Sequence, residues 1–202
     1  MKEIYISTDV ESDGPTPVKN SLLSFASVAI TIDGEIRSTF TANLENFPGA
    51  SPNPKTMRDF WDKEPEAWAA CRTNQQDCSE AMHRYLAWLT DIKTTKGLKP
   101  VFTGYPATYD FMWIAFYLSY FTGQNPFGFG GLCMKSFGMS MRRSDFRESV
   151  KDKYPRRWFA RLPHTHVALD DALEQGIMAV NMIRENQKLP KLEWNIPEIL
   201  PV

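Results

Sequence analysis

The chain has 202 residues, of which 43% are hydrophobic, and a formal net charge of −1. This length suits one domain with a sizeable core; we expect a core over about residues 3–186 and an extended tail over 187–202. No apolar stretch approaches the roughly 18 residues of a membrane span, and no secretory signal precedes the first strand pattern. The three cysteines are an odd number without CxxC spacing, which argues against a disulfide framework and for a cytoplasmic location.

Alternating and continuous apolar runs predict three strands near the N-terminus. They cover residues 3–10, 22–32 and 35–44. The turn signal Asp33-Gly34 joins the second and third strands into a hairpin. The turn-rich segment 12–17 predicts that the first strand runs antiparallel to the second. Residues 47–55 contain three prolines and a glycine, so we expect a loop there.

Helical spacing dominates the remainder of the chain, interrupted by one buried strand over Lys99–Tyr105. Helices are predicted from Thr56 to about Trp61, from Pro65, from Ser79 to about Ile92, from Asp110 to about Phe121, and from about Ala168 to Asn186. Thr56 and Ser79 are the expected N-caps, and Gly123–Gly138 is expected to be a loop with a short element. Antiparallel strands followed by alternating helices and strands indicate an α/β layered domain.

Basic residues are concentrated between Met141 and Arg161. This window carries a charge of +5, and the other residues sum to −6. One interpretation is a solvated surface of mixed charge. The alternative is a contact for a polyanion, in which case the candidate phosphate-binding residues are Arg142, Arg143, Arg156 and Arg157.

Acidic residues stand at the edges of several predicted elements. Asp9 and Glu11 share one face of the first strand, because side chains alternate along a strand, although an ordinary edge-strand acid pair would look the same. Asp110, Asp170 and Asp171 fall in the first turns of helices, where acids also stabilise the helix dipole. His166 precedes the last helix, and its ordinary pKa near 6.5 suits a general base.

In this order, the residues resemble the motifs of the DEDDh superfamily of 3′–5′ exonucleases, which includes proofreading exonucleases, oligoribonuclease and ribonuclease T. The matching positions are Asp9 and Glu11 for the first motif, Tyr109-Asp110 for the second, and His166, Ala168, Asp171 and Ala172 for the third. The third motif selects Asp171 over Asp170 and His166 over His164. Within the superfamily, the chain is most similar to small stand-alone bacterial and phage exoribonucleases, over roughly Glu3–Asn186.

The resemblance implies a ribonuclease-H-like fold, with a central mixed sheet and helices on both faces. It also implies two divalent ions, Mg²⁺ or Mn²⁺, which clamp the attacking and leaving oxygens. Asp9 would bridge both ions, Glu11 and Asp171 would complete the shell of the first, Asp110 would hold the second, and His166 would deprotonate the attacking water. The expected products are nucleoside 5′-monophosphates from the 3′ end of single-stranded RNA, with DNA and 3′ overhangs as further substrates.

Trp61 is a candidate base-stacking residue, with packing in the core as the alternative. A non-catalytic nucleic-acid-binding scaffold on the same fold is the second functional hypothesis, and a phosphatase acting on small substrates is the third. A homodimer is expected because relatives often dimerise.

The sequence departs from the family pattern at two places. Ser12-Asp13-Gly14 replaces the usual Thr-Gly after the first motif, and Cys133 stands where many relatives carry Asp.

Overall fold

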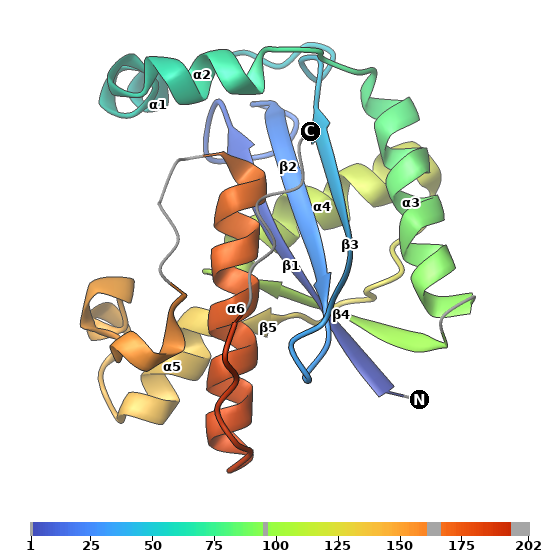
Figure 1. The fold of residues 1–202 in the computed structure, drawn as a ribbon. Helices are drawn as coiled ribbons and strands as arrows, with labels where there is room; N and C mark the ends of the chain where they lie inside the picture. Colours follow the sequence, from blue (N-terminus) through green and yellow to red (C-terminus); the bar gives the residue numbers. More distant parts are fainter. Residues whose placement is uncertain (1, 95–96, 161–166, 195–202) are drawn as a thin grey trace.

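The computed structural model describes residues 2–94, 97–160 and 167–194, which form a mixed sheet with helices on both faces (Figure 1). The five strands lie in the order β3-β2-β1-β4-β5. Their bounds are β1 Lys2–Ser12, β2 Leu22–Ile30, β3 Ile36–Asn43, β4 Leu98–Gly104 and β5 Leu132–Cys133. Strand β2 is antiparallel to both of its neighbours, β1 and β3, while β4 pairs in parallel with β1 and with β5. The predicted fold class is confirmed.

Helices α3 and α4 cover one face of the sheet and α6 crosses the other (Figure 1). The helices are α1 Pro54–Asp59, α2 Pro65–Cys71, α3 Cys78–Thr94, α4 Ala107–Thr122, α5 Met134–Arg142 and α6 Ala168–Asn186. Short 3-10 turns are η1 Trp61–Lys63, η2 Phe146–Glu148, η3 Lys151–Lys153 and η4 Arg156–Trp158. None of the described helices is long and apolar enough to cross a bilayer.

The alternation of side chains along β1 separates the core from the site. Ile4, Ile6 and Val10 are buried in the core beneath α3 and α4. Asp9 and Glu11 are one position out of phase with them, so their side chains point to the α6 face. The same strand therefore anchors the core and presents two carboxylates to the helix that carries Asp171.

Helix α6 approaches β1 closely at Gly176. A Cβ at this position would lie 3.1 Å from the Cβ of Ser7, closer than side chains normally pack. Both positions are small, so the helix axis lies near the strand. This approach fixes how far Asp171, in the first turn of α6, stands from the carboxylates of β1.

The structure corrects two predicted caps. Asn53, not Thr56, caps α1, because its side chain accepts hydrogen bonds from the backbone N–H groups of Lys55 and Thr56. Ser79, the other expected cap, lies inside α3, because this helix begins at Cys78. The Asp77 carboxylate accepts a hydrogen bond from the backbone N–H of Glu80 at 2.9 Å. In both places the capping side chain belongs to an Asn or Asp that the apolar pattern did not include.

The segment expected to be mostly loop, residues 123–138, contains β5 and the start of α5. Its glycines and aromatics obscured both elements. The described part of the tail, up to Trp194, packs without helix or strand: Trp194 donates to Asn181 Oδ1 at 2.9 Å, and Arg184 donates to the Pro190 carbonyl.

Candidate metal centre

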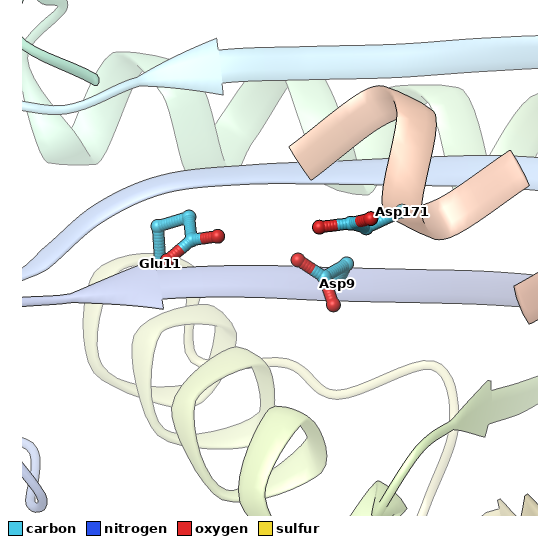
Figure 2. A group of neighbouring side chains, drawn as sticks. All are labelled: Asp9, Glu11 and Asp171. Carbon is cyan, nitrogen blue, oxygen red and sulfur yellow. The ribbon is translucent and has the colours of Figure 1, made fainter. Parts of the chain in front are cut away.

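Three carboxylates meet above the C-terminal end of β1. Oxygens of Asp9, Glu11 and Asp171 lie within 4.8 Å of one another, and Figure 2 shows the three side chains directed toward a common centre. Asp9 is half-buried, and Glu11 and Asp171 are 9% and 4% exposed. Hard oxygen ligands in this arrangement suit Mg²⁺ or Mn²⁺.

Asp110 lies at the edge of this group. Its side chain is 4% exposed, and its Oδ2 has no hydrogen-bond partner among the described residues. A Cβ at Gly104 would lie 2.7 Å from that oxygen, so the glycine at the end of β4 makes room for the carboxylate. Burying an unpaired carboxylate oxygen is costly, and a cation would remove that cost.

Burial and mutual repulsion raise the pKa values of these acids. Burial and then the charge of Asp171 raise the pKa of Asp9 to about 7. Burial and then the charges of Asp9, Asp171 and Asp110 raise the pKa of Glu11 to about 9, and burial followed by Asp9 raises the pKa of Asp110 well above its usual range. Two like charges 4 Å apart repel by about 4 kcal/mol at an effective dielectric of 20. Without a cation, the group therefore holds protons at neutral pH.

Gln175 is a site residue that the sequence analysis missed. Its Nε2 donates to Asp9 Oδ1 at 2.7 Å, and the side chain is 2% exposed. It follows Asp171 by one helical turn, so both project from the same face of α6. The i, i+4 spacing from Asp171 was the available signal, but the contact with Asp9 spans 166 positions.

Lys151 was counted in the basic window but not singled out. Its Nζ lies 2.6 Å from Glu174 Oε2 and 5.5 Å from the ring centre of Tyr105. Its positive charge lowers the pKa of Asp9, in opposition to burial and Asp171. Within the basic window, the structure thus brings a cation close to the acidic group.

The four predicted phosphate contacts have different surroundings. Arg157 pairs with Glu185 through two hydrogen bonds of 2.7 Å, and Glu185 follows Asp171 by 14 residues in α6, about 21 Å along the helix. Arg142 donates to the Glu148 carbonyl. Arg143 and Arg156 are exposed. Arg157, paired with Glu185, can therefore contact only a part of a substrate that is distant from the carboxylates.

Trp61 is placed in the core, which contradicts the stacking interpretation. It is 2% exposed and packs with Leu23, Ala67 and Cys71. Its Nε1 donates to the Ser12 carbonyl at 3.0 Å. A ring enclosed in this way has no free face for a base, so Trp61 supports the backbone immediately after Glu11.

The two departures from the family pattern lie in the connection after β1 and at the start of α5. Asp13 Oδ1 accepts the backbone N–H of Ser21 at 2.6 Å, which fixes the connection between β1 and β2. Cys133 is the N-cap residue of α5. Neither residue belongs to the carboxylate group.

A cavity of about 390 Å³ opens next to the carboxylates. Its floor includes the four residues Ser24, Ala26, Thr41 and Asn43. Ser24 is the cross-strand partner of Glu11, and Ala26 is that of Asp9. The cavity and the acidic group are therefore neighbours on one face of the sheet, and α2 and the start of α6 complete its walls.

His166, the predicted general base, lies outside the described residues.

Comparisons with known proteins found a sequence relative and several similar folds. The chain is 25% identical over 193 residues to the 3′-5′ DNA exonuclease Cap18 of Escherichia coli, covering 94% of this chain and 98% of Cap18. No family model matches the chain.

Solved structures show the same fold. The nuclease domain of 3′hExo, a DEDDh family member bound to rAMP, superposes with a TM-score of 0.65 at 11% identity, over 94% of this chain and 95% of that one. E. coli Exonuclease I in complex with a dA16 oligonucleotide gives a TM-score of 0.60 at 13% identity, over 91% of this chain and 41% of the larger one. S. pombe Pop2p, in its Mg²⁺- and Mn²⁺-bound form, gives 0.55 at 12% identity, over 89% of this chain and 82% of Pop2p.

The solved structures confirm the predicted fold, and the chain is similar over nearly its whole length to one 3′-5′ exonuclease, Cap18.

Proposed function

We propose that this protein removes nucleotides one at a time from the 3′ end of a single-stranded nucleic acid by metal-dependent hydrolysis. The observation that carries the proposal is the meeting of Asp9, Glu11 and Asp171 within 4.8 Å on a DEDDh-type fold. Buried acids with raised pKa values need a cation to ionise together, and hydrolysis of a phosphodiester needs a cation to stabilise developing charge.

The acids of the site supply the ligands in this proposal. Two divalent ions, Mg²⁺ or Mn²⁺, are the expected cofactors, as in the metal-bound form of Pop2p. Asp9, Glu11 and Asp171 would hold one ion, and Asp110, with its unpaired Oδ2, would help Asp9 to hold the other. The ions would polarise the scissile phosphate.

The remaining roles belong to the chain's own residues. His166, at its place in the third motif, would take the proton from the attacking water. The cavity beside Glu11 would receive part of the substrate strand, because its floor residues Ser24 and Ala26 are the cross-strand partners of Glu11 and Asp9. Arg142, Arg143, Arg156 and Arg157 would contact phosphates farther from the cleaved bond.

RNA is the substrate we propose from the resemblance to exoribonucleases. The nuclease domain of 3′hExo was crystallised with rAMP, which supports a ribonucleotide. DNA is the second candidate, and the likeness to Cap18, a DNA exonuclease, over nearly the whole chain supports that alternative. A cytoplasmic homodimer is part of the same proposal, and light scattering of the purified protein tests the oligomeric state.

The test is a gel assay of purified protein on 5′-labelled RNA and DNA of one sequence, with Mg²⁺, Mn²⁺ or EDTA. A metal-dependent ladder that shortens from the 3′ end supports the proposal, and the ratio of the two rates identifies the preferred substrate. Binding without cleavage of either strand would instead support the scaffold hypothesis. Neutralising the four arginines is expected to flatten the salt dependence of binding without removing the ladder.

A further inference from the structure

Gln175 is buried and leaves one polar atom unsatisfied, and this combination costs stability. It is 2% exposed, and its Oε1 has no hydrogen-bond partner among the described residues. A buried, unsatisfied polar atom costs about 1–3 kcal/mol. The favourable contact of this side chain is its 2.7 Å hydrogen bond to Asp9 Oδ1.

The geometry of that bond restricts the Asp9 carboxylate. Asp9 extends from β1, and its terminal torsion is otherwise soft. The amide N–H of Gln175 engages Oδ1 and so fixes the plane of the carboxylate relative to α6, which also carries Asp171. Helix α6 thus carries Asp171 and also holds Asp9 of β1 through Gln175, so the two carboxylates keep a constant relative orientation.

We propose that Gln175 is a positioning residue that orients Asp9 as a ligand for a divalent metal ion. The inference rests on the proposed function, because it assumes that Asp9 binds the metal. Hydrogen-bond partners of metal ligands contribute about 10- to 100-fold to metal affinity or activity in other proteins. We expect an effect of that size from the amide of Gln175.

The experiment compares Gln175→Met and Gln175→Asn with the wild type. Methionine keeps the length and volume without a donor, and asparagine keeps the amide on a side chain that is one methylene shorter. Calorimetric titration with Mn²⁺ measures affinity, and thermal unfolding in EDTA measures stability. Both variants are expected to weaken Mn²⁺ binding by about 10- to 100-fold, with metal-free unfolding temperatures close to that of the wild type and cleavage recovering at saturating Mn²⁺.

Asn181 provides the matched control. It is also a buried amide of α6, donating to the Trp158 carbonyl at 3.0 Å, but it lies beyond the site. Asn181→Leu is expected to lower the unfolding temperature in EDTA and to leave the Mn²⁺ affinity unchanged.

The outcomes separate the two proposals. If the wild type binds Mn²⁺ and cleaves, while both Gln175 variants bind Mn²⁺ as tightly as the wild type, the positioning role is overturned and the exonuclease stands. If the wild type neither binds Mn²⁺ nor cleaves, the proposed function falls, and the role of Gln175 falls with it. Weakened Mn²⁺ binding in both variants with an unchanged unfolding temperature supports the inference.

Discussion

Lys151 and Glu174 form an ion pair of 2.6 Å that attaches the basic segment to helix α6. Glu174 lies between Asp171 and Gln175 in the chain, and both partners of the pair are largely buried, with side-chain exposures of 24% and 14%. The pair thus joins a positively charged segment to the edge of the acidic group.

Removing Lys151 alone should leave a buried acid beside an acidic centre. We expect Lys151→Met to destabilise the metal-free protein by about 1–3 kcal/mol. Lys151→Met combined with Glu174→Gln should recover much of this loss. A double-mutant cycle of unfolding free energies measures the coupling. The exposed pair Lys153–Glu148 is the control, with an expected coupling below about 1 kcal/mol; equal couplings for the two pairs would contradict the argument.

Asp171 and its neighbour provide a direct test of the acidic group. Asp171→Asn is expected to reduce cleavage roughly a thousand-fold or more, because the loss of a metal ligand removes several kcal/mol of charge stabilisation. Asp170→Asn should retain most of the activity, since adjacent helical residues point about 100° apart. Initial rates at fixed Mg²⁺ distinguish the variants, and comparable losses in both would refute the assignment of Asp171.

The free energy of unfolding of the metal-free protein should fall as the pH rises. The pKa values of Asp9 and Glu11 are raised to about 7 and about 9, so between roughly pH 4 and these values the folded chain holds more protons than the unfolded one. The contribution of these acids to stability is present below their unfolded pKa values near 4, and it is lost as pH rises through 7 and 9.

Glu11→Gln replaces one of these acids with a side chain that does not titrate. In EDTA at pH 8 the variant is expected to unfold at a higher temperature than the wild type, by roughly 2–4 °C for each kcal/mol relieved, with little difference at pH 4. Thermal unfolding at both pH values measures the effect. A wild type that gains stability from pH 5 to 9 in EDTA would show that these acids are not the controlling groups.

Filling the cavity should affect substrate binding separately from metal binding. Thr41 is exposed on the cavity floor, so Thr41→Trp occupies the space without disturbing the core. We expect KM for a single strand to rise about tenfold, since one base contact is worth roughly 1–3 kcal/mol, while Mn²⁺ affinity is unchanged. Thr39→Trp, on the same face of β3 but outside the cavity lining, is the control; identical KM values in both variants would exclude the cavity.

Trp61 should now behave as a core residue. Trp61→Ala is expected to destabilise the fold by about 3–5 kcal/mol. Trp61→Phe should cost less, because it keeps a ring but leaves the Ser12 carbonyl without its donor. Denaturant unfolding measures both. A Trp61→Ala variant with unchanged stability and weakened strand binding would revive the stacking hypothesis.

The sequence predicted the features that depend on local periodicity. The alternation along β1 placed Asp9 and Glu11 on one face. The choice of Asp171 over Asp170 came from the resemblance to a family motif, and the structure brings Asp171 to the same acidic group. The hydrogen bond from Gln175 and the ion pair of Lys151 depend on tertiary packing between distant segments, which no local pattern encodes. The burial of Trp61 also depends on tertiary packing, because the sequence alone does not show whether an aromatic ring near a site is exposed to a substrate or enclosed by other side chains.

The close approach of Gly176 to Ser7 has an evolutionary consequence. The gap between α6 and β1 acts as a spacer for the carboxylates that the two elements carry, so a larger residue at either position would move Asp171 away from Asp9. Substitutions at the two positions should therefore be compensatory, with growth at one accompanied by loss of volume at the other. In relatives that keep all four acids, the summed volume of this pair should vary less than that of either residue alone.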